Sequence, residues 1–123
     1  MFDHISLKVA DFAKSLAFYR AALAPLGLTA EQVDEAGKSA GFGPPGALGL
    51  WIGEGKSPLG IHVAFRAPSR AAVRQFYEAA IRSGGKDNGK PGLRPDYSAT
   101  YYAAFILDPD GNNVEAVTHE AER

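Results

Sequence analysis

The chain has 123 residues, of which 46% are hydrophobic and 22% charged, a composition typical of one globular domain with its own core. It contains no cysteine, which excludes disulfides, thiolate metal sites and a catalytic thiol. The formal net charge of −1 and the lack of a long apolar run favour neither nucleic acid nor a membrane as partner. We therefore expect a cytoplasmic protein, with no targeting segment ahead of its first strand.

The first half of the chain predicts a strand, a helix and three further strands. Polar and apolar residues alternate at the start, as in a strand that buries one face. Asp11 is expected to cap a helix whose apolar residues recur every three or four positions until Pro25 and Gly27. The strands are predicted over 2–9, 29–34, 38–42 and 47–53.

The second half repeats this plan. Ser69 is expected to cap a second helix, which ends at Gly84 and Gly85. A long polar segment with one short strand follows, and a loop of that length is often functional. The remaining strands are predicted over 60–66, 101–107 and 113–119, with a turn over 108–112.

The two halves are copies of each other. His4 lies over His62 at an offset of 58 (62 − 4 = 58), and the sequence that follows each histidine aligns without a gap through the helix. Further on, an offset of 65 matches Gly46 with Gly111 and so equates Leu50 with Glu115. We predict an α+β domain over 1–123, built from tandem βαβββ modules at 1–56 and 57–123 whose mixed sheet curls into a cleft.

His4, His62 and Glu115 are the candidate metal ligands. Glu115 lies in the apolar strand "NVEAV", and an enclosed carboxylate needs compensation from a histidinium, hydrogen bonds or a metal ion. Two imidazoles and one carboxylate suit Fe(II), Mn(II), Ni(II) or Zn(II) and leave positions open for substrate. A satisfied core histidine is the simpler interpretation of each imidazole, and pairing with a histidinium or Arg94 is the simpler one for Glu115.

The segments "HISLKVADFAKSLAFY", "GIHVAF" and "YYAAFILDPDGNNVEAV" resemble the vicinal oxygen chelate superfamily, which includes glyoxalase I, extradiol dioxygenases and bleomycin-resistance proteins. The resemblance covers nearly the whole chain and implies that His4, His62 and Glu115 hold a divalent ion. It also implies a homodimer, since members of this size usually dimerise and some build the cleft from two chains. Glyoxalase I has a fourth ligand, a glutamate, where this alignment places Leu50, so a four-ligand site is not expected.

Other residues are candidates for contact with substrate. Tyr101 and Tyr102 point to opposite faces of one strand, so one of them is expected to enter the cleft as a general acid beside catalytic Glu115. Aromatic and polar side chains elsewhere are candidates for lining the pocket, although packing or solvation explains most of them equally well. These candidates are Ser6, Phe42, Trp51, Arg94 and Tyr97.

Two functions are consistent with these patterns. The first is a metal-dependent enzyme, a lyase, isomerase, transferase or dioxygenase, in which the ion stabilises negative charge on a substrate oxygen. The second is a metal-free protein that binds or sequesters a small molecule, as the bleomycin-resistance proteins do. A structural or regulatory domain that kept the fold without the chemistry is a third.

Overall fold

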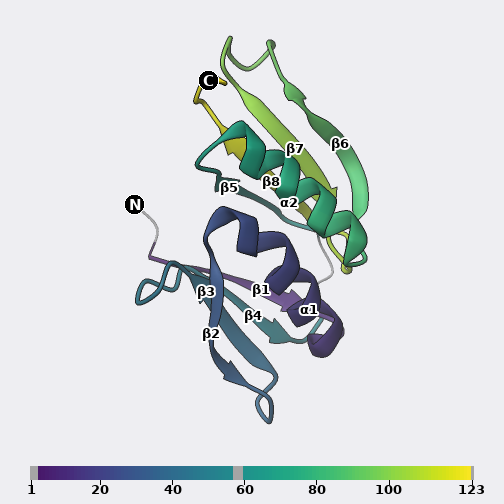
Figure 1. Cartoon of the computed structure of the whole chain (residues 1–123). Coiled ribbons are helices and arrows are strands. Elements are labelled where there is room, and N and C mark those ends of the chain that lie inside the picture. Colours follow the sequence, from purple (N-terminus) through teal and green to yellow (C-terminus); the bar gives the residue numbers. More distant parts are fainter. Residues whose placement is uncertain (1–2, 57–59, 123) are drawn as a thin grey trace.

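The computed structural model describes residues 3–56 and 60–122, and it forms two βαβββ modules (Figure 1). The predicted module boundary after residue 56 adjoins 57–59, and Phe2 of the predicted first strand also lies outside the described residues. The first module contains β1 (Ile5–Val9), α1 (Phe12–Leu23), the 3-10 helix η1 (Ala24–Leu26), β2 (Thr29–Asp34), β3 (Ser39–Gly43) and β4 (Leu50–Glu54). The second contains β5 (His62–Arg66), α2 (Arg70–Arg82), β6 (Lys86–Leu93), β7 (Tyr102–Leu107) and β8 (Asn113–Thr118).

Each module folds its strands into its own sheet. The strand orders are β1-β4-β3-β2 and β5-β8-β7-β6, and the first and last strands of each module run parallel. The other neighbouring strands run antiparallel, which confirms the α+β class and the repeated βαβββ plan. Within the described residues no strand pairing joins the two sheets, so β1 and β5 are both edge strands.

The two helices start at equivalent residues for the same reason. The carboxylate of Asp11 accepts a hydrogen bond from the Lys14 amide at 3.1 Å, and the hydroxyl of Ser69 accepts one from the Ala72 amide at 3.1 Å. Each cap satisfies one of the free amides in a first helical turn. Both predicted N-caps are therefore confirmed, and they lie 58 positions apart.

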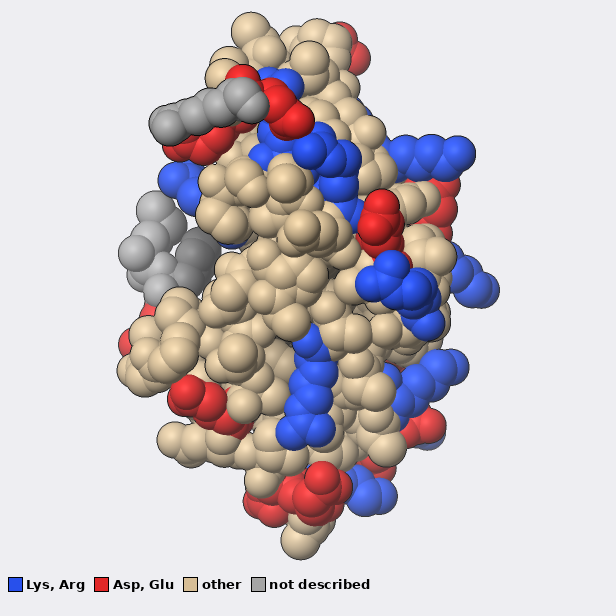
Figure 2. All heavy atoms as spheres, in the orientation of Figure 1, with Lys and Arg blue, Asp and Glu red and all other residues tan. Residues whose placement is uncertain are grey.

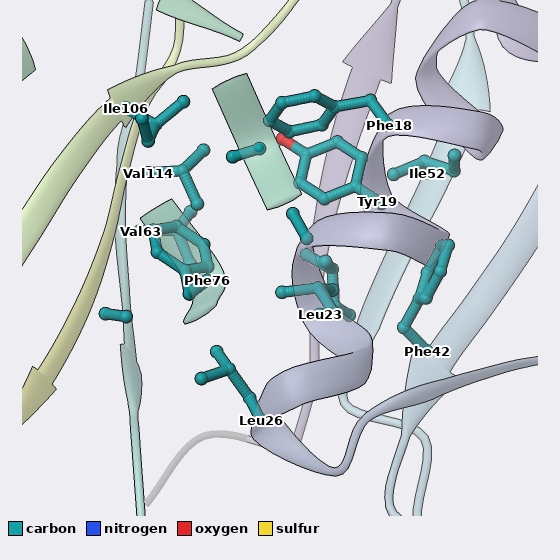
Figure 3. Packing of buried hydrophobic residues seen from close by; sticks show 14 of the residues in the cluster. Phe18, Tyr19, Leu23, Leu26, Phe42, Ile52, Val63, Phe76, Ile106 and Val114 are labelled. Atoms are coloured by element: carbon teal, nitrogen blue, oxygen red, sulfur yellow. The ribbon is translucent and has the colours of Figure 1, made fainter. Parts of the chain in front are cut away.

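One face of each sheet packs against its helix and forms the core (Figure 1). Large side chains of both modules meet where α1 and α2 pack together, among them Phe18, Tyr19 and Phe76 (Figure 3). Residues along β1 alternate between the core and the other side of the sheet: Leu7 and Val9 are buried, whereas Ser6 and Lys8 are exposed. The side of each sheet away from its helix is called its open face below.

The turn of residues 108–112 attaches the second module to the first. Asp108 is buried and accepts hydrogen bonds from the amides of Asp110 and Asn112 at 2.9 and 2.8 Å, and from the hydroxyl of Tyr19 on α1. The carboxylate of Asp110 in turn accepts from the Ala10 amide at 2.8 Å. The motif "DPDGN" is thus a structural joint between the modules.

On the face drawn in Figure 2, basic and acidic side chains are interspersed rather than segregated. Neither α-helix of the described chain combines the length and the apolar character that a bilayer crossing requires.

Candidate functional site

Glu115 lies at the centre of a cluster on the open face of the second sheet. Along β8, Val114 and Ala116 enter the core, so Glu115 between them points to the other side. The sheet register pairs Glu115 with Phe105 of β7 and with Ala64 of β5, and places His62 two residues before Ala64 on the same face. Strand alternation therefore brings an imidazole, a carboxylate and a phenyl ring together.

Both oxygens of the Glu115 carboxylate have protein partners. Its side chain is 3% exposed, and the Tyr101 hydroxyl donates a hydrogen bond to Oε2. The His62 Nε2 atom lies 3.0 Å from Oε1, and the His62 side chain is 49% exposed. These contacts offset the cost of removing a carboxylate from water, and they match the expected compensation by a histidine and a hydrogen bond.

Burial and the Glu115 carboxylate together raise the pKa of Tyr101 from 10.0 to about 12. Burial is the larger cause, followed by the hydrogen bond to Glu115 and the repulsion between two negative charges. Tyr101 is therefore a neutral phenol at physiological pH and acts as a hydrogen-bond donor.

A hollow of about 350 Å³ opens above this cluster. Its walls are aromatic: Tyr97 meets Tyr101 edge-on at 4.9 Å between ring centroids, and Phe105 stacks with the His62 ring at 6.4 Å. Phe105 and Asn113, which also line the hollow, are absent from the sequence-based candidates. Asn113 could have been predicted from the sequence, because it lies two residues before Glu115 on the same strand and therefore faces the same side of the sheet.

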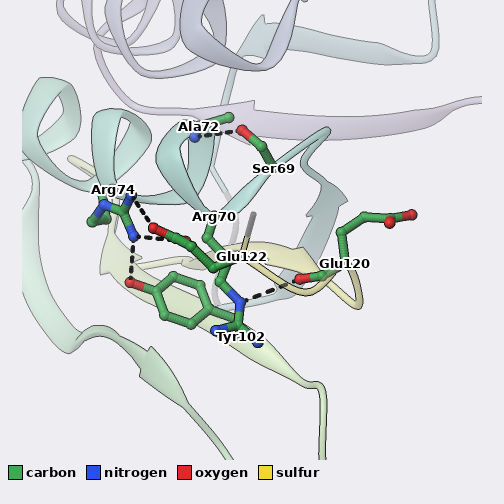
Figure 4. Close-up of polar contacts among 7 residues, drawn as sticks. All are labelled: Ser69, Arg70, Ala72, Arg74, Tyr102, Glu120 and Glu122. Carbon is green, nitrogen blue, oxygen red and sulfur yellow. Dashed lines mark hydrogen bonds and ion pairs between the residues drawn. The ribbon is translucent and has the colours of Figure 1, made fainter.

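Tyr102 faces the opposite side, so its predicted role as a general acid is wrong. Its ring lies beneath the guanidinium of Arg70 at 5.0 Å, and Arg74 donates a hydrogen bond to its hydroxyl at 3.3 Å. Arg74 also pairs with Glu122 at 3.1 Å, which holds the C-terminal segment against α2 (Figure 4). Tyr102 and its partners are part of the scaffold.

The Arg94 guanidinium is occupied by the backbone of its own hairpin. It donates to the carbonyls of Lys90 at 2.7 Å and Gly92 at 2.9 Å, and it lies over the Phe105 ring at 5.3 Å. Arg94 does not line the hollow beside Glu115. The structure thus places it as a support for the Phe105 wall and not as a free anion-binding group.

His4 does not join His62 and Glu115 in a single chain, which corrects the expected three-ligand centre. It lines a separate hollow on the open face of the first sheet, together with Ser6 and Trp51. No three potential metal-ligating residues within the described ranges lie close enough to hold an ion together. The physical reason is the repeat itself, because equivalent positions of two modules lie on two different sheets.

The expected match between Leu50 and Glu115 is also wrong by one residue. The parallel ladders pair Ile5 with Leu50 and its equivalent Val63 with Val114. Trp51 is therefore the structural counterpart of Glu115, at an offset of 64 (115 − 51 = 64). Leu50 enters the core. The position equivalent to Glu115 still carries no acid, as expected, but the residue there is tryptophan and not leucine.

The remaining candidate lining residues are divided between locations. Tyr97 lines the hollow beside Glu115, whereas Ser6 and Trp51 line the hollow of the first module. Phe42 is buried and lines a third hollow, of about 240 Å³, which also includes Ile5 and Val63 and lies apart from the one beside Glu115.

The joint between the modules also positions His62. The side-chain carbonyl of Asn112 accepts a hydrogen bond from the Ile61 amide at 3.0 Å, and the Ile61 carbonyl accepts from the Asn113 amide at 2.9 Å. These bonds align the start of β5 with β8. They therefore set the relative placement of His62 and Glu115, the residues that follow on each strand.

Comparison with known proteins agrees with this fold. A glyoxalase/bleomycin resistance protein from Albidiferax ferrireducens T118 has 27% identity and a TM-score of 0.82, with 96% of this chain and 98% of that chain covered. A glyoxalase/bleomycin resistance protein/dioxygenase family enzyme from Burkholderia phytofirmans PsJN has 15% identity and a TM-score of 0.73, with 96% and 98% covered. A glyoxalase I mutant from Zea mays has 23% identity and a TM-score of 0.66, with 94% of this chain and 46% of that chain covered.

Paired βαβββ modules with open sheet faces define the fold class that these structures share. Residues 1–116 match the Glyoxalase/Bleomycin resistance protein/Dioxygenase superfamily, and the chain belongs to it. No curated protein matches the sequence.

Proposed function

We propose that the protein is a divalent-cation-dependent enzyme of this superfamily, whose site is assembled from two copies of the chain. The observation that carries the proposal is the pairing of Glu115 with His62 at the floor of an aromatic hollow. A buried carboxylate beside a half-exposed imidazole provides two donors of the kinds that such ions prefer.

The spacing of these donors fits an ion as well as it fits an ion pair. Two neighbouring ligands at about 2.1 Å from one cation lie roughly 3 Å apart, and His62 Nε2 lies 3.0 Å from Glu115 Oε1. The Tyr101 hydroxyl holds the other carboxylate oxygen and so fixes the orientation of the donor.

The third donor in this proposal is His4 of the partner subunit. His4 is half-exposed on an open face, and its ring contacts the carboxylate of Asp3, itself almost fully exposed. An exposed apolar residue lies at the start of edge strand β1 and another just before edge strand β5, since Ile5 and Ile61 are each 39% exposed. A twofold dimer that sets the first module of one copy opposite the second module of the other creates two identical sites.

When bound, the cation stabilises negative charge on a substrate oxygen. The chain's own side chains bind the substrate and orient it. Neutral Tyr101 donates a hydrogen bond to Glu115 Oε2 or to a substrate oxygen that replaces it. Tyr97 and Phe105 enclose an apolar substrate surface and limit the access of water.

Cation binding by stripped protein tests the proposal. Titration with Mn(II), Ni(II), Zn(II) and Fe(II) is expected to show one ion per chain, with affinity reduced about a hundredfold or more in His62→Ala and Glu115→Gln. His119→Ala is the matched control, because it removes an imidazole that touches the Tyr101 ring edge-on without lining the hollow. Affinity retained in His62→Ala would contradict the proposal.

A second candidate, metal-free binding of a small molecule, is favoured by one observation. Both Glu115 oxygens already have partners within the chain, so the site is electrostatically satisfied without an ion. Saturable binding of a flat aromatic ligand in excess chelator, by protein that takes up no cation, is the result that would establish this function instead.

A further inference from the structure

The first module has a hollow of its own, of about 340 Å³, on the open face of its sheet. It does not include His62 or Glu115, and its lining combines charged, hydroxyl and aromatic side chains. The kind of ligand that fits this hollow depends on four of its lining residues, Lys8, Ser39, Trp51 and Gly53.

The sheet register arranges these residues in two rows. Lys8 of β1 pairs with Gly53 of β4, which pairs with Ser39 of β3. A Cβ atom built on Gly53 meets no atom within 4 Å, so the space above this glycine is empty. Lys8 and Ser39 therefore lie on the two sides of a glycine floor, the stem of Lys8 runs along Gly55, and the space over Gly53 has room for a ligand group.

The second row is a flat apolar wall. Trp51 pairs with Gly41 of β3, and a Cβ built on Gly41 would lie 3.0 Å from the Trp51 ring atoms Cη2 and Cζ2. The indole thus rests against bare backbone, which fixes its position. Trp51 remains partly exposed and borders the same hollow as Lys8.

Lys8 is free to bind an anion. Among the described residues it forms no ion pair, whereas Lys38 lies 3.1 Å from Glu54 and neutralises the nearby acid of β4. Glu54 also accepts a hydrogen bond from the Phe12 amide at 3.1 Å, on the helix side of the sheet. A lysine ammonium beside a hydroxyl is a common binding arrangement for a carboxylate or a phosphate.

We propose that this hollow binds a small organic anion with a flat apolar body, which packs on Trp51 while its anionic group lies over Gly53 between Lys8 and Ser39. The inference rests on the proposed function only in placing this hollow opposite His62 and Glu115 of the partner subunit. It then identifies the substrate class of the joint site as flat organic acids.

Trp51, the single tryptophan of the chain, reports directly on this hollow. Its fluorescence is titrated with 4-nitrobenzoate and with the neutral 4-nitrobenzamide, both in EDTA so that cation binding plays no part. We expect saturable quenching, with the acid bound about fivefold or more tightly than the amide because of one charge-assisted contact. A further titration with 4-nitrophenyl phosphate shows whether the hollow prefers a phosphate to a carboxylate.

Three variants decide the outcome. Lys8→Gln is expected to abolish the preference for the acid, and Gly53→Val to abolish binding of both probes by filling the space above Gly53, where a Cβ meets no protein atom within 4 Å. Lys14→Gln, which removes a charge from the exposed side of α1, is the control that keeps wild-type binding.

Iodide quenching provides an independent readout of the charge beside Trp51. The iodide quenching constant is expected to fall by about half in Lys8→Gln while the constant for neutral acrylamide stays unchanged. Equal iodide quenching in wild type and Lys8→Gln, or no preference for the acid in wild type, overturns the inference. Neither result depends on cation uptake, so this inference and the proposed function fail separately.

Discussion

At the scale of the residue, the chemistry of the site depends on how one buried carboxylate is held. Glu115 is oriented by Tyr101 and touched by His62, and the contact with Tyr101 changes the proton affinity of the phenol. The raised pKa of Tyr101 gives this contact a measurable signature. In the unfolded chain the phenol loses its proton near pH 10, whereas in the folded chain it keeps the proton until about pH 12.

The stability that Tyr101 contributes is therefore fully present below pH 10 and is lost as the pH rises toward 12. In Tyr101→Phe the free energy of unfolding is expected to fall less steeply across this interval than in the wild type. Urea unfolding at a series of pH values measures the difference. Tyr97→Phe removes the hydroxyl of a residue that is 65% exposed and that contributes less than burial or Glu115 to the raised pKa of Tyr101, so its slope is expected to stay close to that of the wild type. Identical slopes for Tyr101→Phe and wild type would contradict the assigned contact.

At the scale of the element, the turn of residues 108–112 links helix, strand and site. Tyr19 of α1 donates to Asp108 at the core of the turn, and Asn112 in the same turn aligns β5 beside β8. Removing the hydrogen bond between the Tyr19 hydroxyl and Asp108 is therefore expected to weaken the joint between the modules.

Tyr19→Phe leaves the buried Asp108 carboxylate without one of its donors. We expect the free energy of unfolding to fall by about 1.5–3 kcal/mol, the contribution of one hydrogen bond to a charged group, while the Asn112 side chain still donates to the same oxygen. Chemical denaturation measures this loss, and Tyr97→Phe serves again as a surface hydroxyl control with a change near zero. Unchanged stability in Tyr19→Phe would show that the joint does not depend on this bond.

The element scale also shows where sequence reasoning succeeds and where it stops. The repeat predicts both helix caps, and the alternation along β1 predicts that Ser6 and Lys8 share a face away from the core. Gly46 and Gly111 do share a left-handed backbone conformation, with φ of 82° and 85°. Trp51 nevertheless comes five residues after its glycine, whereas its counterpart Glu115 comes four residues after its own (51 − 46 = 5, 115 − 111 = 4).

A shift of one residue turns every side chain of a strand to the other face. The alignment through these turn glycines therefore placed Leu50 opposite Glu115, although the sheet register gives that position to Trp51. Only the register, which depends on backbone pairing across the sheet, identifies the correct residue.

At the scale of the whole molecule, the chain presents two open sheet faces, each with part of a site. The repeated histidines correctly indicate equivalent positions, but equivalence under an internal repeat separates two residues onto two sheets. A single sequence does not contain the placement of a second copy, so it predicts the candidate donors and the fold without predicting how the donors meet. Tyr101 shows the same limit, since alternation predicts that one of the tyrosines 101 and 102 faces the site, and only the structure shows which.

Mixed dimers test the central claim that two copies complete one site. His4→Ala and His62→Ala each remove one donor, and a mixed dimer of the two variants keeps one intact set of donors. After the variants are unfolded and refolded together in equal amounts, about half the dimers are mixed with one of two sites intact, which restores about a quarter of the wild-type cation stoichiometry. Each variant alone is expected to bind about a hundredfold or more weakly, and so to take up no cation at a concentration that just saturates the wild type. A monomeric mass by light scattering, full binding by His4→Ala alone, or no recovery in verified mixed dimers would contradict the claim.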